Sequence, residues 1–197
     1  MSSAVCNLVR DLAALFATGL AIKLLDDYLD RDETFNSRPV LATILDRGTV
    51  AYAILSYALA AELRPSWALT LFLASYGCGM LGDSPWRLPT CLPAWGETWL
   101  VIMLGILATG WQQMISSTAF ILGVQLIDDA FDLAEDRHAL RSNLAAKWGR
   151  AETSLAGIGF VLISLLMDLR KTLLGLTVLP AVLYVARAPW VKEAGKS

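Results

Sequence analysis

Two short acidic motifs are the residues of this chain whose types and spacing could do chemistry. Each has the pattern Asp-Asp-x-x-Asp and directly follows a long apolar stretch. Residues four positions apart share one face of a helix, so the aspartates of each motif would project together. Like charges at this spacing destabilise a helix unless a cation lies between them, and Mg²⁺ prefers oxygen ligands. The two motifs together predict a magnesium site formed by Asp26, Asp27, Asp30, Asp128, Asp129, Asp132 and Asp136.

The ordinary alternative for one acidic run is a solvated helix end. A second copy in the same chain, again following an apolar run, favours the metal site over that alternative.

The composition of the chain is typical of a membrane protein. Of its 197 residues, 56% are hydrophobic and only 17% are charged, and the mean hydropathy is +0.54. This balance favours the lipid bilayer as the surrounding medium, with a soluble and very apolar helical bundle as the alternative. A net charge of −2 argues against nucleic acid as a partner. The three cysteines lack the spacing of metal ligands, and we expect buried thiols.

Apolar runs separated by proline, glycine and charged residues predict helices and no strands. The fifth helix is expected to begin near Met114, after a break at residues 110–113, and to run into the second motif. A charged turn is expected at residues 168–171 and a basic loop at 137–150. The other expected helices cover residues 4–30, 48–63, 65–81, 94–109, 154–167 and 173–186. The sequence therefore predicts an all-α integral membrane bundle of about seven transmembrane helices, forming a single domain over residues 1–197.

The basic residues are unevenly distributed over the predicted connections. One side of the membrane would hold only Arg64, Arg170 and Lys171. The opposite side would hold Arg31, Arg38, Arg47, Arg87, Arg137, Arg141, Lys147, Arg150, Arg187, Lys192 and Lys196. Because cytoplasmic loops carry an excess of Lys and Arg, both acidic motifs are expected to face the cytoplasm.

The first motif resembles that of a known enzyme family. Asp26-Asp27-Tyr28-Leu29-Asp30-Arg31, followed by Arg38-Pro39, is similar to the Asn-Asp-x-x-Asp-x-x-x-Asp and Arg-Pro of the UbiA family of intramembrane prenyltransferases. Asp132, Asp136 and Gly149 match the second UbiA motif, Asp-x-x-x-Asp followed by Gly. The chain departs from the family at Asp26, where Asn is usual, and at Thr34, which stands at the last Asp. The family usually has nine spans.

Soluble trans-isoprenyl diphosphate synthases are also similar. Residues 125–132 fit their Phe-Gln-x-x-Asp-Asp-x-x-Asp pattern, with Val124 in place of Phe, although Phe35-Asn36 stand where paired arginines usually follow the first motif. Both resemblances imply that the aspartates hold magnesium and that magnesium holds an isoprenyl diphosphate. The aspartates that the resemblance makes catalytic are Asp26, Asp30, Asp132 and Asp136.

The basic and aromatic residues near the motifs can each be interpreted in two ways. Arg38, Arg137, Arg141 and Lys147 are candidates for binding the diphosphate, or they simply set the membrane topology. Tyr28, Tyr52 and Phe131 could stabilise an allylic carbocation, although ordinary packing also explains them. His138, the only histidine, is expected to be solvated in the basic loop, with a role as general base as the alternative.

The function expected from the resemblance is magnesium-dependent transfer of a prenyl group from an isoprenyl diphosphate to a lipophilic acceptor, such as an aromatic quinone precursor. Isoprenyl diphosphate synthase or terpene cyclase chemistry is one alternative. A non-catalytic membrane module that binds a lipid diphosphate is the other.

Overall fold

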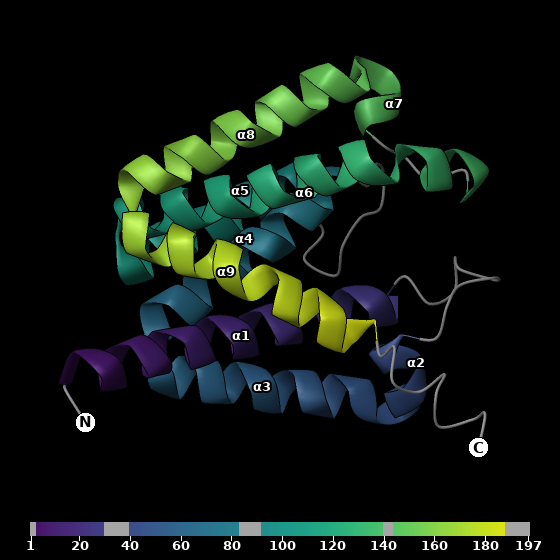
Figure 1. Cartoon of the computed structure of the whole chain (residues 1–197). Coiled ribbons are helices and arrows are strands. Elements are labelled where there is room, and N and C mark those ends of the chain that lie inside the picture. The colour runs from purple at the N-terminus through teal and green to yellow at the C-terminus, as the bar shows by residue number, and fades with distance from the viewer. Residues whose placement is uncertain (1–2, 30–39, 83–91, 140–143, 188–197) are drawn as a thin grey trace. The chain divides into compact units, whose positions relative to one another are not determined.

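The computed structural model describes residues 3–29, 40–82, 92–139 and 144–187, without the side chains of 80–82, 132–139 and 144. Every regular element within these residues is a helix (Figure 1). In chain order they are α1 (Ser3–Leu29), α2 (Leu41–Leu45), the 3-10 helix η2 (Asp46–Gly48), α3 (Thr49–Leu63), α4 (Pro65–Gly82), α5 (Ala94–Thr109), α6 (Trp111–Ala139), α7 (Leu144–Trp148), α8 (Arg150–Met167) and α9 (Leu169–Ala186).

The all-α prediction is confirmed for the described residues. The helices of at least 15 residues are α1, α3, α4, α5, α6, α8 and α9, and they lie at the seven predicted places. Several predicted boundaries were wrong. Gln112 and Gln113 are helical, the turn before α9 consists of Asp168 alone, and α8 begins at Arg150 rather than at residue 154. The predicted basic loop at 137–150 contains the end of α6, with His138, and the helix α7. Most of the connection between the predicted helices at 65–81 and 94–109 lies outside the described residues.

Single residues join three pairs of long helices, namely Arg64 before α4, Gly110 before α6 and Asp168 before α9. At each joint the N–H group closes one helix and the C=O group opens the next. Gly110 donates its N–H to the Ile106 carbonyl over 2.8 Å, and its own carbonyl accepts the Met114 N–H over 3.3 Å. Its φ of +93° lies in the region that favours glycine. Each connecting residue therefore has both of its backbone groups paired, which suits an apolar surrounding.

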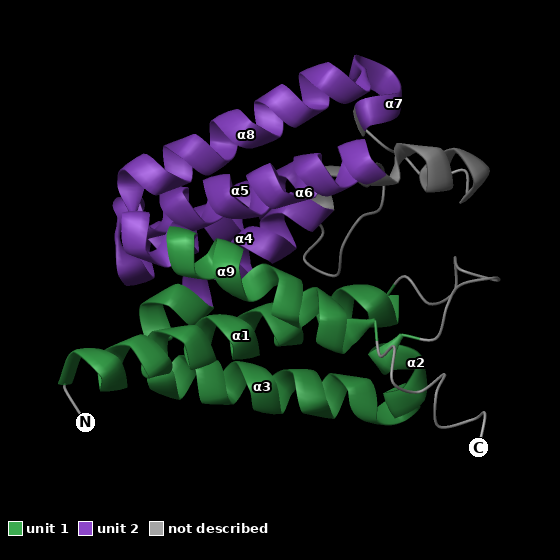
Figure 2. Cartoon of the chain, in the orientation of Figure 1, with its two compact units in different colours: residues 1–68, 173–197 green, residues 69–172 purple. Residues whose placement is uncertain are grey.

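The chain divides into two compact units, which are described separately (Figure 2). Unit 1 contains residues 1–68 and 173–197, and unit 2 contains residues 69–172. In unit 1, α1 packs against α3 around the small side chains of Ala17 and Ala60. Small residues at such a contact let helix backbones approach closely.

An ion pair also links α1 to the joint between α3 and α4 in unit 1. Asp11 is fully buried and accepts a hydrogen bond from the Nε of Arg64. The Arg64 guanidinium also lies 5.5 Å from the ring centroid of Trp67. Arg64 is therefore engaged inside the unit, although its place in the sequence suggested a charge exposed in a connection.

In unit 2, α6 and α8 are in close contact at Gly123 and Gly157. A Cβ atom on Gly123 would lie 3.0 Å from the Gly157 carbonyl oxygen. A Cβ atom on Gly157 would lie 3.0 Å from the Gly123 carbonyl oxygen and 2.8 Å from Cγ1 of Ile127. Neither position has room for a methyl group, so glycine is what allows the two backbones to pack directly.

We expect Gly157→Ala to lower the free energy of unfolding by about 1–3 kcal/mol, because overpacking forces the helices apart. Gly159→Ala is the matched control on the same helix, since a Cβ atom there meets nothing within 4 Å. It should be neutral or stabilise by up to about 1 kcal/mol through helix propensity. Denaturation in detergent micelles measures both variants, and equal stabilities would contradict this account of the α6–α8 contact.

A buried polar cluster joins α4, α6 and α9 within unit 2. Lys171, in the first turn of α9, is only 2% exposed. Its ammonium donates to Ser117 Oγ over 3.0 Å, and to the carbonyl oxygen and Oε1 of Gln113 over 3.2 and 3.3 Å. The Asp168 carboxylate lies 4.0 Å from the ammonium and accepts the backbone N–H of Lys171 over 3.0 Å. Ser117 extends the cluster by donating to Thr70 Oγ1 over 2.7 Å.

Three helices are long and apolar enough to cross a membrane, namely Trp111–Phe131 within α6, Arg150–Met167 (α8) and Leu169–Ala186 (α9). α5 is also apolar but has only 16 residues. The remaining spans of the predicted seven stay a prediction. On α8 one face is apolar and exposed, through Leu155, Ile158, Leu162, Ile163 and Leu166.

Candidate functional site

The first acidic motif begins in the last turn of α1, in unit 1. Asp26 is exposed and Asp27 is half-buried, and both lie near the negative end of the helix dipole. Lys23, about one turn earlier, pairs with both carboxylates at distances of 2.9 Å. The other two predicted residues of this half, Asp30 and Arg38, lie outside the described residues.

Lys23 shows that two carboxylates of the first motif can converge on one cation. Its ammonium lies between Asp26 Oδ2 and Asp27 Oδ1, where the sequence argument placed a metal ion. These two carboxylates would hold Mg²⁺, which usually completes its shell with waters and substrate phosphates. No group of three or more potential metal-ligand side chains gathers anywhere in the described part of the chain. The described part of the first motif therefore offers magnesium a pair of ligands.

The second motif lies on the C-terminal part of α6, in unit 2. Asp128 is exposed and Asp129 is half-buried. The backbone of α6 continues as a helix to Ala139, so Asp132 and Asp136 follow Asp128 at helical intervals of four, as predicted. Three predicted site residues on this helix, Asp132, Asp136 and Arg137, have side chains outside the description, and the whole of Arg141 lies outside it.

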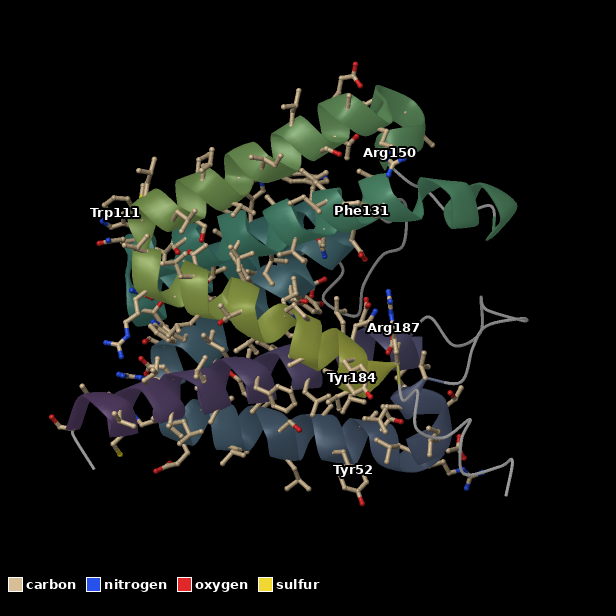
Figure 3. The ribbon with its side chains drawn as sticks, viewed as in Figure 1. Tyr52, Trp111, Phe131, Arg150, Tyr184 and Arg187 are labelled. Carbon is tan, nitrogen blue, oxygen red and sulfur yellow. The ribbon has the colours of Figure 1, made fainter. Side chains whose placement is uncertain are left out.

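Cationic side chains accompany the second motif in unit 2. Lys147, a predicted diphosphate-binding residue, is exposed on α7, which packs against α6. Arg150, at the start of α8, was not predicted. Its guanidinium carbon lies 5.9 Å from the ring centroid of Phe131, which follows Asp128 by about one turn of α6 (Figure 3). The exposed arginine is therefore held beside the acidic motif by an aromatic ring.

The aromatic candidates differ in their surroundings. Phe131 is 69% exposed and Tyr52, on α3, is 53% exposed. Packing within their units therefore does not explain why these positions are aromatic. Tyr28 is half-buried on α1, as packing would require. The side chain of His138 lies outside the description.

The two motifs fall in different units, Asp26 and Asp27 in unit 1 and Asp128 and Asp129 in unit 2. In each unit, the described part of the site is therefore a pair of carboxylates on the C-terminal part of a long helix. Lys23 is the nearby cation in unit 1, and Arg150 is the nearby cation in unit 2. No protein-family model, curated protein or solved structure matches the chain.

Proposed function

We propose that the protein is an integral membrane protein whose seven long helices cross the bilayer. Three of them have the length and composition of a membrane span. The 18 residues of α8 extend about 27 Å, close to the roughly 30 Å of a hydrocarbon core. Exposed tryptophans mark both ends of the α5–α6 hairpin. Trp95 lies at its open end. Trp111 lies beside the Gly110 joint and is labelled in Figure 3. Tryptophan is enriched at membrane interfaces, so this placement supports the proposal.

The surroundings of the charged residues support a cytoplasmic location for the motifs. Of the three cations on the opposite side, Lys171 is buried, and Arg64 is half-buried and paired with buried Asp11. The asymmetry of loop charge is therefore greater than the sequence count suggests. The described cations on the motif side, Arg47, Lys147, Arg150 and Arg187, are all exposed.

Within this membrane setting, the proposed reaction is magnesium-dependent transfer of a prenyl group from an isoprenyl diphosphate to a lipophilic acceptor, as in the UbiA family that the motifs resemble. The observation that carries the proposal is the repeated Asp-Asp-x-x-Asp, each copy following the apolar part of a long helix. Carboxylates there would hold a metal–diphosphate head group, while the apolar helices offer the prenyl chain a non-aqueous surrounding.

The residues take distinct roles in this reaction. Bound magnesium supplies positive charge that stabilises the departing diphosphate. The cations bind diphosphate oxygens, and arginine suits bidentate contacts with them. To the predicted Arg38, Arg137, Arg141 and Lys147 we add Arg150, because Phe131 holds it beside the second motif. The carboxylates that hold the metal are Asp26, Asp27, Asp30, Asp128, Asp129, Asp132 and Asp136.

One observation favours a second candidate function, a non-catalytic module that binds a lipid diphosphate. Lys23 already pairs with Asp26 and Asp27, so one of their two negative charges is neutralised without a metal ion. Turnover that depends on magnesium separates the enzyme from such a module.

The direct test is to incubate the purified protein in lipid nanodiscs with geranyl, farnesyl or geranylgeranyl diphosphate and a hydroxylated aromatic acceptor, with and without magnesium. We expect diphosphate release and a prenylated acceptor, identified by mass, only when magnesium is present. Elongated or cyclised products would assign synthase or cyclase chemistry instead. Binding of the diphosphate without any product would assign the non-catalytic module.

Lys23→Gln is expected to bind Mg²⁺ about tenfold more tightly than the unmodified protein, because an internal cation no longer competes for the two carboxylates. Calorimetric titration with magnesium chloride in nanodiscs measures the change. Arg47→Gln removes an exposed cation from the same unit without touching the pair, and it serves as the control. Unchanged or weaker magnesium binding by Lys23→Gln would show that these carboxylates are not metal ligands.

A further inference from the structure

Glu97, in the first turn of α5, is a buried carboxylate with an unused oxygen. The residue is only 7% exposed, and its Oε2 atom has no hydrogen-bond partner among the described residues. The Tyr76 side chain on α4 interacts with this carboxylate, but Oε2 still has no donor among the described residues. A buried acceptor without a donor is destabilising, and few such atoms occur in folded proteins. None of the roles described above uses this carboxylate.

The surrounding backbone fixes Glu97 in place within unit 2. Its N–H group donates to the Pro93 carbonyl over 3.1 Å, and the next residue, Thr98, donates its hydroxyl to the Gly77 carbonyl over 3.1 Å. These bonds hold the start of α5 against α4. The positive end of the α5 dipole favours a carboxylate in the first turn, which reduces the cost of burying it. The dipole still supplies no donor to Oε2.

The position of Glu97 along the bundle places it below the second motif. α5 and α6 form a hairpin at Gly110, and a Cβ atom on Gly105 would lie 3.2 Å from Cγ of Met114, which sets their register. Equal numbers of residues from Gly110 bring Glu97 level with residue 123 of α6. Asp128 then lies about 7 Å further along α6, at 1.5 Å per residue. The free oxygen is thus at the motif end of unit 2 and one to two turns deeper among apolar helices.

We propose that Glu97 Oε2 accepts a hydrogen bond from the hydroxyl group of a lipophilic aromatic ligand. A hydroxylated ring supplies the missing donor and an apolar body in one molecule. Exposed Trp95 and Trp99 on the same helix mark the interfacial region where such molecules partition. Identifying this ligand as the prenyl acceptor rests on the proposed function, whereas the binding of a hydroxyl group does not.

The test compares 2-naphthol with its methyl ether, which differ in the hydroxyl donor. Calorimetric titration of the full-length protein in nanodiscs, without magnesium or diphosphate, measures both dissociation constants. We expect 2-naphthol to bind at least about tenfold more tightly than the ether, the effect of a hydrogen bond to a charged acceptor. Glu97→Leu should remove this preference. Glu152→Gln should keep it, because Glu152 holds the same first-turn position on α8 but is exposed.

Melting curves of the ligand-free variants distinguish a binding role from a structural one. If Oε2 is free for a ligand, Glu97→Leu and Glu97→Gln should melt at or above the temperature of the unmodified protein, because Leu removes the buried acceptor that lacks a donor and Gln removes its charge. A structural carboxylate predicts a clear loss of melting temperature in both variants, and that result would overturn the inference.

Two further outcomes separate this inference from the proposed reaction. If the protein shows no preference for 2-naphthol but still transfers prenyl groups, the Glu97 site is disproved and the proposed reaction is not affected. A preference that depends on Glu97 in a protein with no prenyl transfer supports the site and removes its assignment to the acceptor.

Discussion

Replacing Lys171 with methionine is expected to lower the free energy of unfolding by about 3–5 kcal/mol. The ammonium joins Gln113, Ser117 and the nearby Asp168 carboxylate. Methionine fills a similar volume but donates no hydrogen bond, so several buried acceptors would lose their donor at once. Denaturation of the detergent-solubilised protein measures the loss.

Arg170→Met is the matched control for this variant, because Arg170 precedes Lys171 on the same helix but is exposed. Its effect should stay within about 0.5 kcal/mol. The double variant Lys171→Met with Asp168→Asn should be less destabilised than the sum of its single changes. In the double variant, residue 168 carries no negative charge that would need the missing ammonium. Equal stabilities of Lys171→Met and Arg170→Met would disprove the importance of the cluster.

Asp132→Ala and Asp30→Ala are each expected to lower prenyl diphosphate turnover by about 100-fold or more. Even groups behind metal ligands change affinity or activity by about 10–100-fold, and a direct ligand should matter more. The fold should survive, because removing one carboxylate relieves repulsion among its neighbours. Single-turnover assays at saturating magnesium measure the rates, and melting curves verify the fold.

Glu62→Ala is the control for this pair, because Glu62 is an exposed acid on α3 and belongs to neither motif. It should retain full turnover. Near-normal turnover by either aspartate variant would count against metal binding at that position. Loss of turnover accompanied by unfolding would instead assign that aspartate to the fold.

Most of the helical architecture was predictable from the sequence, because apolar runs between prolines, glycines and charges determine the long helices. The errors arose where polar side chains bond to groups far away in the sequence. Gln112 and Gln113 resemble a turn, yet Gln112 donates to the Met167 carbonyl over 2.8 Å, and Gln113 bonds to Lys171. Partners so distant in sequence leave no local pattern, so the polar residues were assigned to connections.

Less of the candidate site was predictable. The spacing of the second motif on one helix followed from helical periodicity, and the backbone of α6 bears it out. Lys23 was missed although its spacing from Asp26 and Asp27 is the usual spacing of helical ion pairs. The contact of Arg150 with Phe131 joins two helices, so no pattern within either helix sequence predicts it. The burial of Glu97 depends likewise on how α4 and α5 pack.

At Arg64, Gly110 and Asp168 a single residue separates two long helices, so the connections contain no extra residues. An α-helix turns about 100° per residue, so one residue inserted at Gly110 and absorbed by the helix would rotate all of α6 by that angle. Met114 and Ser117, now fully buried, would leave the interior together. Chain length is therefore as constrained at these joints as residue identity is at Gly157.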